Sequence, residues 1–277
     1  MSAPRRTRLT AGGTSTRLVE AGPADRSEAV VFVHGNPGSA DDWVGLVQAA
    51  GTVTRAVAVD LPDFGETVAP DGFDHRPETY ARWLGSALEA LGIERAHLVL
   101  HDFGGPIGLM WAGANPQRLA SLTLIDTGIL PGYRWHRLAR IWRTPVVGEI
   151  FQAITTPRQL ARGIAREEPR GLPQPFLDTM ASHWDRRTKR AVLRLYRATP
   201  DPGRGPAGGM PVSADLPVLV IWGEGDVYLP SSYAGRQREA FPKAQVHVLA
   251  GSGHWPFADA PEEVERLLLD FLRTVAS

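Results

Sequence analysis

Three polar residues that lie far apart in the sequence, Asp102, Asp226 and His254, occur in the chain order of a nucleophile, an acid and a base. Asp102 follows an apolar run and precedes Gly104 and Gly105, so it falls on a predicted turn between a buried strand and a helix. Small residues around a reactive side chain permit the sharp turn called a nucleophile elbow. Since a carboxylate stands where the pattern G-x-S-x-G has serine, the sequence predicts a carboxylate nucleophile.

A carboxylate nucleophile restricts the possible reactions. An aspartate side chain with an ordinary pKa of about 3.9 is ionised at neutral pH, so it needs no base to act as a nucleophile. Its attack on an acyl carbon would give a reactive anhydride. The productive target is therefore an sp³ carbon that carries a leaving group, and the product is an alkyl ester of the enzyme. Water must then cleave this ester, and that step requires a base. The alternative interpretation is that Asp102 only caps the following helix, because Asp is a favoured N-cap residue.

The candidate acid and base each follow a predicted strand. Asp226 comes after the strand 218–222, and His254 comes after the strand 245–249. Both lie beyond the carboxyl ends of strands, where open α/β sheets place their sites. We predict that His254 activates water and that Asp226 orients the imidazole. Asp126, which also ends a predicted strand, is the alternative acid, but the glycine-flanked turn favours Asp226.

A loop rich in glycine and proline, residues 34–38, follows the apolar run 29–33. Its composition lets the backbone curl near the elbow. In enzymes with a nucleophile elbow such a loop supplies one N–H group of the oxyanion hole. We therefore predict that the backbone N–H groups of Asn36 and Phe103 stabilise a developing negative oxygen. Taken alone, the loop is equally consistent with a plain Gly-Pro turn.

Strands and helices alternate along most of the chain. The predicted elements are a hairpin at 6–20, strands at 29–33, 55–61, 96–101, 120–126, 218–222 and 245–249, and helices at 78–91 and 104–114. Strands that alternate with helices at this spacing predict an α/β fold with a mostly parallel, doubly wound sheet.

The alternation stops after residue 127, where the sequence becomes helical, arginine-rich and aromatic. We predict that residues 128–211 form a helical cap over the elbow, ending in a Pro- and Gly-rich loop at 200–209. The α/β core is then 1–127 and 212–277. The predicted substrate-binding residues are the cap aromatics Tyr133, Trp135, Trp142 and Trp184. Packing inside the protein is the alternative role for each of them.

Composition limits the class of protein. A chain of 277 residues, 43% of them hydrophobic and 22% charged, is long enough for one large domain with an insertion. The net charge is zero, so neither nucleic acid nor an anionic membrane is indicated as a partner. Cysteine is absent, which removes disulfides and thiolate chemistry. Since no apolar run follows the N-terminal arginines, we expect a cytoplasmic protein. We expect a monomer or homodimer, and the aromatic residues of the cap favour a bulky, apolar small molecule as the substrate.

These motifs together resemble the branch of the α/β-hydrolase fold superfamily that contains epoxide hydrolases and haloalkane dehalogenases. The resemblance rests on residues 34–37, 60–65, 101–105, 223–226 and 253–254, and it covers about 29–127 and 212–275. It implies an aspartate nucleophile and no metal or cofactor. Two positions depart from the family: Asp63 stands where glycine is common, and Phe103 stands where both kinds of enzyme commonly have tryptophan.

The resemblance implies two ways of stabilising the leaving group. A halide is held by N–H donors, usually an indole after the nucleophile and the Asn of the 34–37 motif; Asn36 fits this role but Phe103 has no side-chain N–H. An epoxide oxygen leaves as a basic alkoxide, which a cap tyrosine with a pKa near 10 can protonate. Tyr196 is similar in placement to such a tyrosine. The family's first cap tyrosine has no clear match, and the candidates to replace it are Tyr133, Trp135 and Trp142.

The sequence therefore predicts a hydrolase that opens an epoxide through an ester on Asp102. A haloalkane dehalogenase that uses the same covalent route is the alternative. A further alternative is a ligand-binding protein that keeps the fold without catalysis, and the complete set of Asp102, Asp226 and His254 argues against it.

Overall fold

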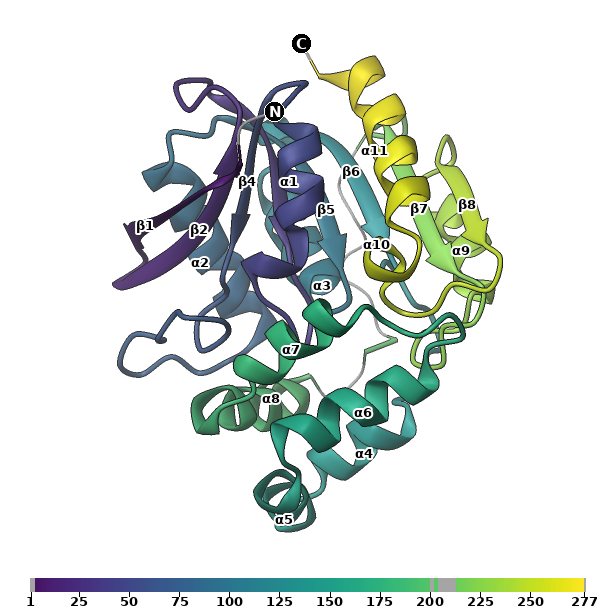
Figure 1. Cartoon of the computed structure of the whole chain (residues 1–277). Helices are drawn as coiled ribbons and strands as arrows, with labels where there is room; N and C mark the ends of the chain where they lie inside the picture. The colour runs from purple at the N-terminus through teal and green to yellow at the C-terminus, as the bar shows by residue number, and fades with distance from the viewer. Residues whose placement is uncertain (1–2, 200–201, 204–212, 277) are drawn as a thin grey trace.

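A single mixed sheet forms the centre of the structure, a computed structural model that describes residues 3–199, 202–203 and 213–276 (Figure 1). The strands run in the order β1-β2-β4-β3-β5-β6-β7-β8. Their bounds are β1 (Arg5–Ala11), β2 (Thr14–Ala21), β3 (Glu28–Val33), β4 (Arg55–Val59), β5 (Arg95–His101), β6 (Leu119–Ile125), β7 (Val218–Gly223) and β8 (Gln245–Leu249). Each predicted strand is present, with ends that differ by at most two residues.

Strand β2 pairs antiparallel with both β1 and β4, whereas the remaining neighbours are parallel. The predicted hairpin at 6–20 is therefore the antiparallel edge of the sheet. Helices cover both faces: Figure 1 shows α1 (Val44–Ala50) and α11 (Pro261–Val275) in front, with α2 (Pro77–Ala90) and α3 (Gly104–Ala114) behind. Because both faces are covered, the residues of β4 are all buried, which explains the continuous apolar runs of the sequence.

Five helices lie between β6 and β7 in the chain: α4 (Arg137–Arg143), α5 (Val147–Ile154), α6 (Pro157–Glu167), α7 (Gln174–Ser182) and α8 (Arg186–Ala198). They gather beyond the ends of the parallel strands, on the side to which the arrowheads point (Figure 1). We call residues 128–199 the cap segment. The predicted cap end at 211 and most of the predicted loop 200–209 lie outside the described residues, so this domain boundary stays a prediction.

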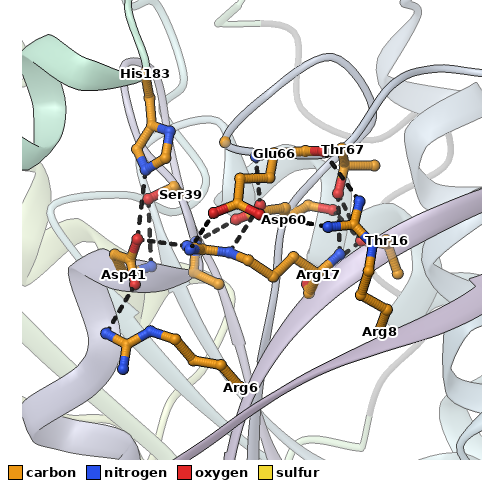
Figure 2. Close-up of polar contacts among 12 residues, drawn as sticks. Arg6, Arg8, Thr16, Arg17, Ser39, Asp41, Asp60, Glu66, Thr67 and His183 are labelled. Carbon is orange, nitrogen blue, oxygen red and sulfur yellow. Dashed lines mark hydrogen bonds and ion pairs between the residues drawn. The ribbon is translucent and has the colours of Figure 1, made fainter.

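A buried arginine on β2 connects the loop after β3 with the loop after β4. The Arg17 guanidinium in β2 lies 3.3 Å from Asp60 and 3.0 Å from Glu66, and it also pairs with Asp41 (Figure 2). The ring of His183, just after α7, approaches the same Asp41 carboxylate at 3.3 Å. This network therefore fixes one side of the cap segment to the loop after β3.

Asp63, which replaces the glycine common in the resembling family, adopts a left-handed backbone with φ of 66°. Glycine adopts this conformation without steric cost, whereas Asp adopts it less readily. The Asp63 carboxylate is held by His75 at 2.9 Å and by the backbone N–H of Ala69 at 2.8 Å. These side-chain hydrogen bonds support the left-handed conformation at Asp63.

No helix among the described residues is long and apolar enough to cross a membrane.

Candidate active site

Asp102 stands on a sharp turn between β5 and α3, with a positive φ of 46°. Three glycines permit this turn. A Cβ on Gly35 would lie 2.4 Å from the Asp102 side chain, one on Gly104 would lie 2.2 Å from a carbonyl of β3, and one on Gly105 would lie 1.9 Å from Thr127. The Thr127 hydroxyl donates to the Asp102 carbonyl at 2.7 Å, which fixes the turn from the other side. The predicted elbow is therefore present, with Asp102 at its apex.

Two backbone N–H groups face the Asp102 carboxylate. The N–H of Asn36 donates to Oδ1 at 2.8 Å, and the N–H of Phe103 also bonds the carboxylate. Burial by itself raises the pKa of Asp102, but His254 and these hydrogen bonds together hold it below its usual value. Asp102 is therefore ionised at neutral pH. The amide group of Asn36 is buried and interacts with the Tyr196 hydroxyl without forming a hydrogen bond of good geometry.

The imidazole of His254 lies between two carboxylates. Its Nδ1–H donates to Oδ2 of Asp226 at 2.8 Å, and its Nε2 lies 3.7 Å from Oδ2 of Asp102. The other oxygen of Asp226 accepts the backbone N–H groups of Tyr228 and Leu229 at 2.7 and 2.9 Å. Although burial lowers the pKa of His254, the two carboxylates raise it well above its usual value. The structure thus brings together the predicted nucleophile, acid and base.

Asp126, the alternative acid of the sequence analysis, lies beside this group but does not bond the imidazole. Its Oδ1 accepts the Gly223 N–H at 2.9 Å, and its Oδ2 is buried without a partner among the described residues. Burial and the charge of Asp226 raise the pKa of Asp126 well above its usual value, so its neutral form is favoured. Asp126, Asp226 and His254 could each offer one atom to a metal, within 4.8 Å of one another. Since Asp226 and His254 already bond to each other, we assign the group to acid–base work.

Two residues that the sequence analysis did not single out hold the loop of His254. The His101 Nε2–H donates to the His254 carbonyl at 2.8 Å; burial lowers the pKa of His101 to about 3, which keeps it neutral. Glu168, which follows α6, accepts the His254 backbone N–H at 3.3 Å. Burial raises the pKa of Glu168 to about 7. A Cβ on Gly253 would lie 1.9 Å from the Glu168 carboxylate, so glycine is needed for this approach.

Asp102 borders two cavities. The first, which we call the elbow cavity, has a volume of about 110 Å³. Its apolar lining includes Phe103, Leu109, Ile129 and Leu130. The second, which we call the catalytic cavity, measures about 20 Å³ and lies between Asp102 and His254. Its further lining includes Asn36, His136, Trp142, Ile164, Tyr196 and Tyr228.

Tyr196 enters the catalytic cavity from α8. Its ring is buried and contacts the rings of Phe103 at 4.8 Å and of Trp142 and Trp135 at 5.0 Å. Burial and the Asp102 charge raise the pKa of Tyr196 well above its usual value, against the opposing effect of the Asn36 side chain. The hydroxyl is therefore protonated at neutral pH and available as an acid.

His136 also lines the catalytic cavity, and the sequence analysis missed it. Its Nδ1 accepts the Ala139 N–H at 3.3 Å and caps α4, while burial lowers the pKa of the ring to about 4. A neutral imidazole that accepts through Nδ1 carries its proton on Nε2. The ring lies 6.2 Å from that of Tyr196, so a second donor stands beside the tyrosine. No sequence signal pointed to it, because histidine is not a favoured N-cap residue.

The predicted cap aromatics separate into three groups. Tyr133 and Trp135 line the elbow cavity, where the Tyr133 hydroxyl already donates to a backbone carbonyl at 2.9 Å. Trp142 lines the catalytic cavity, and its indole N–H has no partner among the described residues. Trp184 packs behind Trp142 at 6.2 Å, fully buried, and lines neither cavity. This placement corrects the prediction that Trp184 contacts substrate, since its role is packing within the cap segment.

Residues 30–267 match the alpha/beta hydrolase family, and the chain belongs to that family. It is 28% identical over 274 residues to a 2-hydroxy-6-oxononadienedioate/2-hydroxy-6-oxononatrienedioate hydrolase of Paraburkholderia phymatum, covering 94% of this chain and 92% of the relative. It is 29% identical over 258 residues to a cis-3-alkyl-4-alkyloxetan-2-one decarboxylase of Shewanella oneidensis, covering 86% and 80%. These names describe different reactions, so the shared family defines a hydrolase but not its substrate.

Solved structures of epoxide hydrolases share the fold. One from Mycobacterium thermoresistibile superposes with a TM-score of 0.81 at 22% identity, covering 98% of this chain and 99% of the other. A Vigna radiata enzyme superposes with a TM-score of 0.81 at 19% identity, covering 99% of each chain. At these identities the likeness establishes the architecture alone, which agrees with the predicted α/β-hydrolase fold.

Proposed function

We propose that this hydrolase opens an epoxide to a diol through an alkyl ester on Asp102. The observation that carries the proposal is that the catalytic cavity combines an ionised carboxylate with Tyr196, a protonated acid. A carboxylate attacks carbon, while a phenol protonates the oxygen that leaves. The neutral His136 is a second donor to the same oxygen.

In the first step, Oδ2 of Asp102 attacks one epoxide carbon and forms a C–O bond while the ring C–O bond breaks. The ring oxygen takes the proton of Tyr196, which leaves an alcohol on the ester and a tyrosinate in the cavity. The His136 N–H stabilises the developing negative charge on that oxygen. The nucleophile needs no base, because Asp102 is already ionised.

In the second step, His254 takes a proton from water, and the hydroxide attacks the carbonyl carbon of the ester. The tetrahedral oxyanion accepts the N–H groups of Asn36 and Phe103, the two groups that face Asp102 in the resting enzyme. Collapse breaks the ester bond, and the departing diol oxygen takes the proton from His254. Asp102, left as a carboxylic acid, then releases its proton to solvent, while Tyr196 regains a proton from solvent. Alkylation removes the Asp102 charge that helps to raise the pKa of His254, so the imidazole becomes more readily neutral in the ester.

The relatives bear on the substrate class. An oxetan-2-one, named in the decarboxylase of Shewanella oneidensis, contains a strained oxygen ring, as an epoxide does. This relative therefore supports a strained C–O ring as the electrophile. Direct hydrolysis at an acyl carbon is disfavoured for this chain, because a carboxylate nucleophile would form an anhydride.

Haloalkane dehalogenation is the second candidate. The Asn36 amide and the Trp142 indole are buried and line the catalytic cavity, and the indole N–H has no partner among the described residues, so both could donate to a halide. A panel of small epoxides and of bromo- and chloroalkanes separates the two functions. Diol formation without halide release supports the proposal, whereas halide release without diol formation supports the alternative. Turnover of neither class would support a protein that binds ligands without catalysis.

A further inference from the structure

The charge of the chain is unevenly distributed. Residues 128–199 contain 14 arginines and lysines and only five acidic residues, a formal charge of +9. The rest of the chain contains 16 basic and 25 acidic residues, a formal charge of −9. The net charge of zero gave no indication of an anionic partner. It is the sum of a basic cap segment and an acidic remainder of the chain, so the cap segment on its own could bind an anionic partner.

An apolar ridge stands on the outside of this basic segment. Val146, Val147, Ile150 and Ile154 are 67, 48, 56 and 68% exposed, and three of them lie on α5. We call these four residues the α5 ridge. Figure 1 shows α5 at the end of the cap segment most distant from the sheet. A surface helix normally turns such a face toward the core, so a cluster of exposed apolar residues indicates a binding surface.

Exposed arginines lie on α4 and α6, the helices before and after α5 in the chain. Arg137 and Arg140 belong to α4, which contacts α5, and Arg158, Arg162 and Arg166 follow one face of α6. All five are exposed and form no ion pair with any residue that the structure describes. Arginines without an acidic partner and an exposed apolar helix face in the same cap segment match the combination by which interfacial helices bind anionic lipid.

A groove beside α5 adjoins the catalytic cavity. It has a volume of about 340 Å³ and lies among α4, α5 and α6, with Arg137 at its rim and Phe151 of α5 in its wall. It shares four lining residues with the catalytic cavity: His136, Leu138, Ile164 and Tyr228. Because α5 carries most of the ridge and also contributes Phe151 to the groove wall, a molecule that left a lipid phase beside α5 would meet a partly apolar path toward Asp102.

We propose that the α5 ridge docks on an anionic lipid surface, from which the groove receives a lipophilic substrate. Charge disfavours a symmetric dimer through the ridge, because contact between two cap segments would bring two +9 surfaces together, whereas an anionic lipid surface complements that charge. The docking stands independently of the chemistry. The substrate class, a lipophilic epoxide, rests on the proposed function.

Vesicle flotation tests the docking. At low salt the protein should float with vesicles that contain phosphatidylglycerol, and binding should fall as salt increases. The double variant Ile150→Ser/Ile154→Ser should bind at least about tenfold more weakly. Arg158→Gln/Arg162→Gln should bind about thirtyfold more weakly. The matched control is Val68→Ser/Val248→Ser, which alters two exposed apolar residues outside the cap segment and should bind like the wild type.

Three results would overturn the docking. These are failure of the wild type to bind anionic vesicles at low salt, equal binding by the ridge variant and the wild type, and equal loss in the control variant. Sedimentation velocity without lipid tests whether a second copy of the chain covers the ridge instead. If the wild type is a dimer and Ile150→Ser/Ile154→Ser is a monomer, the ridge is a contact between copies and the lipid docking is overturned. Circular dichroism melting shows whether each variant is folded.

Activity separates the docking from the chemistry. The ridge variant, Ile150→Ser/Ile154→Ser, should hydrolyse a water-soluble epoxide at the wild-type rate. On a long-chain epoxide dissolved in anionic vesicles it should be slower than the wild type, by the same factor as its loss of vesicle binding. Equal rates on the vesicle substrate would contradict the proposed delivery. If the wild type opens no epoxide of either kind while it still binds vesicles, the proposed function fails and the docking stands.

Discussion

The Nε2 atom of His254 lies 3.7 Å from Oδ2 of Asp102, beyond hydrogen-bonding distance. Its Nδ1 atom is fixed to Asp226 at 2.8 Å, so the ring cannot turn away. The imidazole thus faces the position at which water would attack an ester on Asp102. This geometry is suited to a base that acts after the nucleophile has reacted.

The first prediction distinguishes the two buried acids. Asp226→Asn should reduce turnover by orders of magnitude and accumulate the alkyl-enzyme, because the imidazole loses the carboxylate that orients it. Asp126→Asn should remain near the wild type, since a neutral Asp126 and a neutral Asn are similar in shape and charge. Turnover and intact mass measured for both variants check this expectation. The opposite pattern would assign the orienting role to Asp126.

The second prediction concerns Tyr196. Tyr196→Phe removes only a hydroxyl, so the fold should be retained while alkylation by an epoxide slows by about 10²–10⁴-fold. Rapid-quench measurement of the first turnover isolates this step. An unchanged alkylation rate would exclude Tyr196 as the acid.

The third prediction concerns His136. His136→Asn places a favoured N-cap residue at the start of α4 and removes the Nε2 donor, so thermal stability should be kept while alkylation slows by about tenfold or more. Single-turnover rates and melting curves check both parts. A loss of stability without a loss of rate would show that His136 serves only the helix.

The predictable part of the site is encoded locally. The elbow could be predicted from Gly104, Gly105 and the loop around Asn36, because a sharp turn and a close backbone approach need particular residues at fixed positions. Asp226 and His254 could be placed because both follow strands of a parallel sheet.

The cap segment was less predictable because its side chains are positioned by packing between helices. Trp184 and Trp142 are both buried indoles, and nothing in their sequence neighbourhoods shows that only Trp142 reaches the catalytic cavity. Glu168 was missed for the same reason, since its contact joins residues 86 positions apart. Tyr196 was found through the resemblance to a family rather than through a local pattern.

The fourth prediction concerns pH and stability. The pKa of Glu168 is about 7 in the folded chain, above its ordinary value of 4.5, so the folded state retains the proton longer than the unfolded state. Its stabilising contribution is therefore complete below about pH 4.5 and is lost as the pH rises toward about 7. Glu168→Gln should raise the melting temperature relative to the wild type at about pH 8, but not at about pH 4. An equal difference at both values would contradict the raised pKa.

The most direct test of the account is the intact mass of His254→Ala after exposure to a small epoxide that the wild type hydrolyses. This variant retains the nucleophile and lacks the base, so it should gain the mass of one epoxide, and peptide mapping should locate the gain at Asp102. Asp102→Ala should gain nothing. Absence of an adduct on His254→Ala, or an adduct at any other residue, would contradict an alkyl-enzyme ester on Asp102.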